Sequence, residues 1–106
     1  MLKKYIIVQT HTNKRVVLDR IAERLIDDRL VACVNIYPNE YSLYKYNDKI
    51  VRDREYLFHA KSVDCKFDKI AKVIQELHNY ETPEIISLEI SQGNEMYLKW
   101  IKDEVS

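Results

Sequence analysis

The sequence predicts an α+β fold, a ferredoxin-like β-α-β-β-α-β antiparallel sheet followed by an extra C-terminal helix. Apolar runs of strand length alternate with segments in which apolar residues recur every three or four positions, the spacing of an amphipathic helix. Two strand-like segments follow each other directly across Asn47-Asp48, as in a hairpin. The 106 residues are 46% hydrophobic and 32% charged, so we expect one globular domain over 1–106.

The first third of the chain predicts a strand followed by a helix. Residues 4–10 are apolar and rich in β-branched side chains, which is typical of a buried strand. In 14–28 the residues Val17, Ile21 and Leu25 recur every four positions and define one apolar helix face. Thr12 and Asn13 precede this segment and have the side chains that cap helix N-termini.

The middle of the chain predicts a long hairpin. Residues 30–46 form the first strand, and the apolar residues 31–36 predict a central position in the sheet. Pro38 cannot donate to a strand ladder, so it predicts a bend, a bulge or an edge. Asn47 and Asp48 tolerate the left-handed conformation of a tight turn, and 49–61 returns as the second strand of the hairpin.

The last third predicts a helix, a loop, a strand and a final helix. Asp64 is expected to cap a helix over 66–77. Pro83 keeps Thr82 out of the helical conformation, which places a loop at 78–83 before a strand over 84–92. Asn94 is then expected to cap the last helix, which runs to about Val105.

This arrangement leaves one face of the sheet without helices. Tyr, Ile and Val side chains on that face would lie in water, and a second subunit is the simplest cover. The hairpin is also long for a monomer of this size, so we expect it to extend across a neighbouring subunit.

Composition excludes several classes of protein. Lys plus Arg and Asp plus Glu both number 17, so the basic excess of nucleic-acid-binding proteins is absent. Gly93 is the single glycine, which excludes the Gly-rich loops that hold nucleotide phosphates. No apolar stretch approaches the ~20 residues of a bilayer span, and no signal region is present at the N-terminus. We therefore expect a cytoplasmic protein with two free cysteines and no membrane or nucleic-acid partner.

Several short motifs resemble the divalent-cation tolerance family, CutA. They stand in that family's order and spacing, and the resemblance covers essentially the whole chain. The motifs are Ala32-Cys33-Val34-Asn35-Ile36-x-Pro38, Ser42-Leu43-Tyr44, Lys49-Ile50, Glu55, Lys61-Ser62, His78-x-Tyr80-Glu81-x-Pro83-Glu84-Ile85-Ile86 and Tyr97-Leu98-x-Trp100-Ile101.

The resemblance implies a homotrimer whose long hairpins interlock around a three-fold axis, with clefts between the subunits. It also implies binding of, or a response to, copper or another divalent cation, and no catalysis. Two alternatives stay open: a PII-like small-molecule sensor and a structural anchoring trimer, each using the inter-subunit cleft. An acylphosphatase-like enzyme is disfavoured, because Arg15 follows a turn that lacks the glycines of a phosphate cradle.

The candidate metal ligands are His78, Cys33, His11 and Glu81. Some members of the family have a proposed copper site with a first-strand Cys and a pair of His residues. Here Thr10 and Leu77 occupy two of those positions, and His78 is the residue of that set that this chain retains. The alternative is that His78 caps the carbonyl groups at the end of its helix.

The candidate residues of the inter-subunit cleft are Glu55, Lys61, Tyr80 and Trp100. Glu55 and Lys61 are six residues apart on one strand and therefore share a face, where they could bind a small anion or a metal. The alternative for this pair is an ion pair at the subunit interface. Tyr80 and Trp100 could line the cleft or serve as aromatic anchors of the interface.

Overall fold

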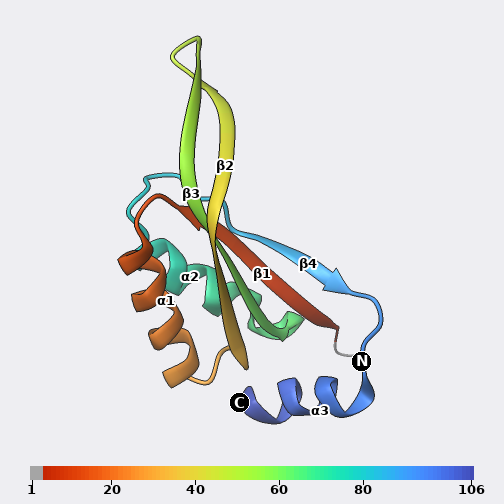
Figure 1. Ribbon diagram of the computed structural model, residues 1–106. Coiled ribbons are helices and arrows are strands. Elements are labelled where there is room, and N and C mark those ends of the chain that lie inside the picture. The colour runs from red at the N-terminus through yellow and green to blue at the C-terminus, as the bar shows by residue number, and fades with distance from the viewer. Residues whose placement is uncertain (1–3) are drawn as a thin grey trace.

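A computed structural model describes residues 4–106 and confirms the predicted α+β order (Figure 1). The four strands form one antiparallel sheet in the order β2-β3-β1-β4. No helix within 4–106 has the length and apolar character needed to cross a membrane. The elements are β1 (Tyr5–Thr12), α1 (Arg15–Asp27), β2 (Cys33–Tyr46), β3 (Lys49–Val63), a 3-10 turn (Asp64–Lys66), α2 (Phe67–Leu77), β4 (Ile86–Ile90) and α3 (Glu95–Glu104).

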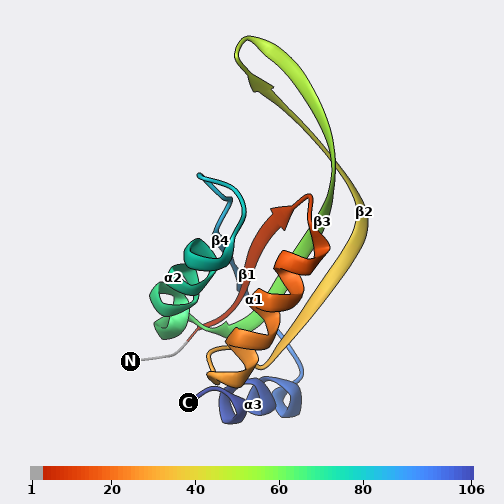
Figure 2. The ribbon, with the colours of Figure 1, turned by 90° about the vertical axis from the view of Figure 1, so that its left-hand side faces the viewer.

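The core lies between one face of the sheet and helices α1 and α2, which lie side by side in front of the sheet in Figure 2. Alternate residues of the two central strands face the helices, so Val8 of β1 and Phe58 of β3 are fully buried. Leu18 and Ile21 of α1 and Ile74 of α2 pack onto them and are also fully buried. Each such side chain contributes about 1.5–3 kcal/mol through the hydrophobic effect.

Strand β2 lies at an edge of the sheet, so the prediction of a central position was wrong. The apolar side chains Val34 and Ile36 pack against the core on the helix side, and this contact explains their character without a second neighbouring strand. The prediction that Pro38 marks a bulge or an edge is confirmed. The β2–β3 register shifts between Tyr37 and Glu40, and Asn39 has a φ of 68°.

Beyond the bulge, β2 and β3 leave the core as a long two-stranded ribbon (Figures 1 and 2). The turn at its tip is the predicted one, because Asn47 and Asp48 have positive φ values of 50° and 63°. The ribbon carries large exposed apolar and aromatic side chains: Tyr41, Leu43, Tyr44, Tyr46 and Ile50. Exposed apolar side chains gathered on one element are typical of an interaction surface.

Two of the three predicted helix caps were wrong. Lys14 precedes α1 without a side-chain cap bond. The Thr12 hydroxyl donates to Asn79 and accepts a hydrogen bond from the Lys14 amide at 3.3 Å, so it reaches the residue before the helix and no amide within it. Asp64 begins a 3-10 turn and does not cap α2, which follows Lys66. Asn94 caps α3 as predicted, since its side-chain oxygen accepts a hydrogen bond from the Tyr97 amide at 3.1 Å.

Helix α3 packs at the end of the sheet that lies opposite the ribbon (Figure 1). Its residue Ile101 is fully buried. Arg29, in a left-handed conformation with φ of 56°, donates side-chain hydrogen bonds to the carbonyls of Asp103 and Glu104 at 3.0 and 3.1 Å. These bonds satisfy carbonyl groups at the C-terminal end of α3.

We predict that Phe58→Ala lowers the free energy of unfolding by about 3–5 kcal/mol, because it removes a fully buried ring and leaves a cavity between β3 and the helices. Guanidinium unfolding at a fixed protein concentration measures the change. Met96→Ala is the control, since Met96 is 82% exposed and its truncation should change the free energy by less than about 0.5 kcal/mol. Equal effects of the two substitutions would contradict this description of the core.

Candidate functional site

A cleft of about 760 Å³ lies where the β2–β3 ribbon leaves the core. The ribbon forms one wall, and the loop between α2 and β4 forms the other. Four carboxylates line the cleft, and its lining includes neither Lys nor Arg. These carboxylates belong to Asp53, Glu55, Glu81 and Glu84. The negative charge of this lining favours a cation over the small anion that the sequence left open.

Glu55 and Tyr80 are the innermost polar pair of the cleft. Glu55 is only 7% exposed, and its Oε2 accepts a hydrogen bond from the Tyr80 hydroxyl at 2.5 Å. The same hydroxyl accepts a hydrogen bond from the Asn13 amide at 3.0 Å. Burial and the bond to Glu55 raise the pKa of Tyr80, so its hydroxyl stays protonated and continues to donate.

Nearer the tip of the ribbon, a second tyrosine–carboxylate pair repeats this arrangement. The Tyr44 hydroxyl of β2 donates to Asp53 Oδ2 on β3, and this hydrogen bond raises the pKa of Tyr44. Asp53 and Glu55 are two residues apart and therefore project from the same side of β3. Two carboxylates of one strand are thus each held in place by a phenol.

His11, near the end of β1, contributes an imidazole ring to the lining of the cleft. Its Nδ1 lies 2.5 Å from Glu84 Oε1, and its Nε2 lies 3.6 Å from Glu40 Oε1. A carboxylate accepts but does not donate, so Nδ1 carries a proton and donates it to Glu84. In the neutral ring, Nε2 then has a free electron pair on the side of Glu40.

A short hydrogen-bond chain continues from Glu84 across the sheet. Gln9 donates through Nε2 to Glu84 Oε2 at 2.8 Å, and Gln9 Oε1 accepts from His59 Nε2 at 2.9 Å. Burial, followed by the nearby Lys61 and His11, lowers the pKa of His59. This chain fixes the orientation of Glu84 and so of the His11 ring.

His78 uses both ring nitrogens in structural hydrogen bonds. Nε2 donates to the His11 carbonyl at 2.8 Å, and Nδ1 accepts from the Tyr80 amide at 3.0 Å. Burial lowers the pKa of His78, which keeps the ring in this neutral form. Binding of a metal by His78 would break one of these bonds, and the bonds tie the loop after α2 to the end of β1.

The structure separates the residues that the sequence proposed for one cleft. Glu55 and Tyr80 lie together, as described above, whereas Lys61 lies six residues further along β3, about 20 Å away at the usual strand rise. Lys61 Nζ bonds Asn35 Oδ1 at 3.0 Å and lies 5.7 Å from the centre of the Tyr97 ring. Trp100 stacks on Tyr97, and the centres of the two rings are 5.7 Å apart.

The four proposed metal ligands are also divided. Cys33 is at the α3 end of the sheet, where its sulfur lies 3.6 Å from the Tyr97 hydroxyl. His11 and Glu81 line the cleft, and His78 lies behind it with both nitrogens occupied. Within residues 4–106 no group of three or more His, Cys, Asp or Glu side chains is placed to hold a metal ion.

Sequence reasoning missed Asp53, Tyr44 and Glu84 as cleft residues. The alternation of Asp53 and Glu55 along one strand was a usable signal, because residues two apart share a face. The contact between His11 and Glu84 joins residues 73 positions apart, and local patterns carry no information on such a pair.

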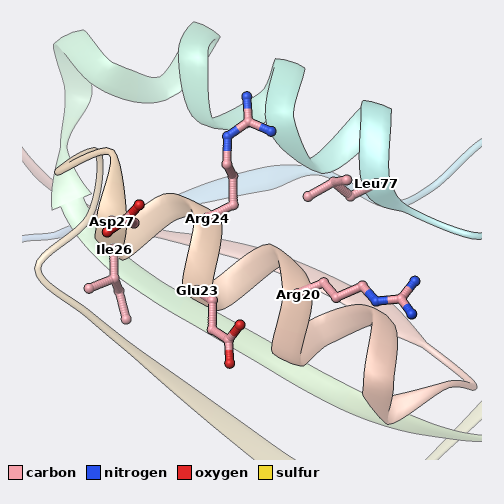
Figure 3. A pocket seen from close by; sticks show the side chains of 6 residues that line it. All are labelled: Arg20, Glu23, Arg24, Ile26, Asp27 and Leu77. Atoms are coloured by element: carbon pink, nitrogen blue, oxygen red, sulfur yellow. The ribbon is translucent and has the colours of Figure 1, made fainter.

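A second hollow, of about 720 Å³, lies between α1 and α2 (Figure 3). Figure 3 shows Arg24 reaching from α1 toward α2 and Leu77 at the end of α2. Arg24 Nε already donates to Asp28 at 2.8 Å, and Glu23 and Asp27 balance the remaining charge. The hollow contains none of the residues predicted from the sequence.

The fold and the cleft together define a ferredoxin-like protein with an extended β-ribbon and an acidic cleft at its base. The family model of the CutA1 divalent ion tolerance protein matches residues 6–104, and the chain belongs to this family.

Named relatives and solved structures agree with this assignment. The divalent-cation tolerance protein CutA of Thermus thermophilus is 40% identical over 83 residues, which cover 78% of this chain and 81% of that protein. The Xenopus laevis protein CutA homolog is 40% identical over 85 residues, 80% of this chain. That match spans 56% of the Xenopus protein, and matches to the rice and mouse relatives each span 48% of those proteins.

The solved structures cover nearly the whole chain. The structure of CutA1 from Oryza sativa has a TM-score of 0.93 at 32% identity and covers 97% of this chain and 94% of its own. The Thermus thermophilus structure has a TM-score of 0.92 at 34% identity and covers 96% and 99%. The architecture of the single chain, ribbon included, is therefore shared with these proteins.

We predict that the protein becomes less stable as the pH decreases below about 7, and that His78 contributes to this loss. Above its ordinary pKa of about 6.5, His78 is neutral in both the folded and the unfolded chain. As the pH falls through that value, the unfolded chain takes up a proton first, because the pKa in the folded protein is lowered. The free energy of unfolding should therefore decrease from about pH 7 toward the folded-state pKa, with His59 adding to the slope in the same direction.

His78→Gln tests this assignment by guanidinium unfolding at several pH values. Gln does not titrate, so the slope against pH should shrink, while the loss of one ring hydrogen bond lowers the stability at pH 7 by about 1–2 kcal/mol. An unchanged slope in the variant would show that His78 does not contribute to the pH dependence.

Proposed function

We propose that this protein is a homotrimer that binds, or responds to, divalent cations such as copper, and that it has no catalytic activity. The observation that carries the proposal is the cleft, whose lining combines four carboxylates and His11 with no Lys or Arg. Imidazole and carboxylate are suitable ligands for Cu(II) and Zn²⁺. The relatives from Thermus thermophilus and Archaeoglobus fulgidus are named divalent-cation tolerance protein CutA, which agrees with a cation as the ligand.

His11 is the side chain best placed to begin a metal site. Glu84 holds its Nδ1–H at 2.5 Å, and a metal-binding His commonly donates its second ring nitrogen to a carboxylate in this way. The electron pair of Nε2 faces Glu40, so an imidazole nitrogen and a carboxylate oxygen would be the first two ligands.

A single chain does not complete this ligand set. Structural zinc sites use four ligands, and within 4–106 no third His, Cys, Asp or Glu joins His11 and Glu40 at a metal-binding position. We propose that water or a side chain of a neighbouring subunit supplies the remaining ligands. A site of this kind would bind metal only in the assembled protein.

The surface of the subunit supports the proposed trimer. Ile86 and Leu88 on β4 and Tyr37 on β2 lie on the sheet face opposite α1 and α2, and each is 43% exposed. The ribbon adds its own exposed aromatic side chains. Three copies that interlock their ribbons would cover both surfaces, as the family resemblance implies.

We also propose that the protein is cytoplasmic and not an enzyme. Cys33 and Cys65 are both free thiols, which fits a reducing compartment. The relative from Archaeoglobus fulgidus, by contrast, is described as periplasmic. Arg15 pairs with Asp19 on the surface of α1 at 3.8 Å and makes no phosphate cradle with the turn before it.

Titration calorimetry of the purified protein with Cu²⁺ and Zn²⁺ tests the metal proposal. We predict saturable binding that weakens about 10–100-fold in His11→Ala and in Glu84→Gln, the ligand and the carboxylate that orients it. Glu89→Gln is the matched control, because Glu89 pairs with Lys4 outside the cleft and its loss should leave the affinity unchanged. Absence of saturable binding, or equal affinity in His11→Ala, would refute the site.

A further inference from the structure

Helix α1 ends in a backbone turn that requires a left-handed residue, and that residue is Arg29. The Arg29 amide donates to the Ile26 carbonyl at 3.0 Å. The next amide, of Leu30, donates to the Leu25 carbonyl at 2.9 Å. These two bonds form a Schellman motif, in which the residue at the position of Arg29 is most often glycine. Arg29 has a φ of 56°, and a residue with a side chain pays a conformational cost here that glycine does not.

The same residue, Arg29, holds the C-terminal end of α3, which lies beside the end of α1 (Figures 1 and 2). Its side chain donates through Nη2 to the Asp103 carbonyl at 3.0 Å and through Nε to the Glu104 carbonyl at 3.1 Å. Its own carbonyl accepts a hydrogen bond from the Ser106 amide at 3.1 Å. One strained residue therefore makes three hydrogen bonds to the segment 103–106.

Few apolar contacts fasten α3 to the rest of the subunit. Of its ten residues, Ile101 alone is buried, and the large side chains of Met96, Tyr97 and Trp100 are exposed. An isolated helix shorter than about 12–15 residues is marginal in water, so α3 depends on its docking. An element with few buried contacts is the kind that opens locally while the rest of a protein stays folded.

The turn at the end of α1 does not by itself explain the presence of an arginine. Glycine or asparagine would adopt the left-handed conformation with less strain, and neither has a side chain long enough to replace the guanidinium. The bonds from Arg29 instead satisfy carbonyl groups that lack an intrahelical partner at the end of α3. The strain in one helix and the docking of another are thus linked through a single residue.

An opening of α3 would uncover two polar side chains of the sheet. The Tyr97 hydroxyl lies 3.6 Å from the Cys33 sulfur, and the Lys61 ammonium lies 5.7 Å from the centre of the Tyr97 ring. Cys33 on β2 and Lys61 on β3 are direct partners in the strand register. Both contacts are lost when α3 leaves the sheet, so a thiol and an ammonium group would be bared side by side.

We propose that Arg29 is a latch, and that α3 is a lid that opens from the start of β2 while the sheet, α1 and α2 stay folded. The left-handed conformation of Arg29 opposes the three hydrogen bonds that close the lid, so the closed state is only weakly favoured. The latch lies within one chain and uses no residue of the acidic cleft. It therefore does not depend on the proposed metal site.

Hydrogen exchange of the full chain, followed by mass spectrometry, tests the latch. Arg29→Asn keeps a residue that tolerates the left-handed conformation and removes the guanidinium. We expect the α3 amides to exchange about tenfold faster in this variant, because two hydrogen bonds from a charged donor are lost. The amides of β3 that pair with β1 should keep their rate. Arg24→Gln is the matched control, since Arg24 bonds Asp28 on the surface of α1 and its loss should leave α3 unchanged.

Arg29→Lys separates the latch from the strain. It keeps the positive charge and the left-handed side chain but loses the forked pair of donors, so its α3 should also exchange faster than in the unchanged protein. Circular dichroism checks folding, and this variant carries the test if Arg29→Asn does not fold. Unchanged exchange of α3 in the folded variants would overturn the latch. An equal acceleration in α3 and β3 would mean that the whole subunit opens, which would overturn the lid.

Discussion

The arrangement of the whole molecule depends on the pairing of β3 with two neighbours along different parts of its length. Near its C-terminal end, β3 lies between β1 and β2, and Phe58 and Ala60 are buried against the helices. Toward its N-terminal end it pairs with β2 alone within the described chain, and it carries Asp53 and Glu55. One continuous strand thus joins the hydrophobic core to the acidic cleft, so the position of the carboxylates is set by the packing of the core.

The second wall of the cleft is held by a few long-range hydrogen bonds. His78 bonds the carbonyl of His11, and Tyr80 bonds Glu55 and the amide of Asn13. These contacts fasten the loop after α2 to the end of β1. His78, one of the four metal ligands that the sequence proposed, therefore serves to shape the cleft, and His11, another of the four, lines it. Stability and ligand binding share these bonds, and a change in one is expected to affect the other.

Local patterns were sufficient for the order of elements and for the ribbon. Periodicity identified each helix, Pro38 marked the bulge, and the pair Asn47-Asp48 identified the turn. The pattern of 31–36 could not distinguish an edge strand from a central one, because packing against helices also requires apolar residues. The cap at Thr12 was wrong because its hydroxyl binds the Lys14 amide, one residue before α1, and the cap at Asp64 was wrong because a 3-10 turn precedes α2. The pairing of His11 with Glu84 depends on chain segments that meet only after folding.

The proposed trimer depends on one constraint: a single subunit leaves its apolar ribbon and the open face of its sheet exposed. Tyr46 and Ile50 near the ribbon tip are 65% and 69% exposed, a large apolar surface for a chain of 12.7 kDa. Sedimentation equilibrium at micromolar concentration decides whether the trimer forms. We expect a single species with three times the mass of one chain; a folded, well-behaved species with the mass of one chain would refute the trimer.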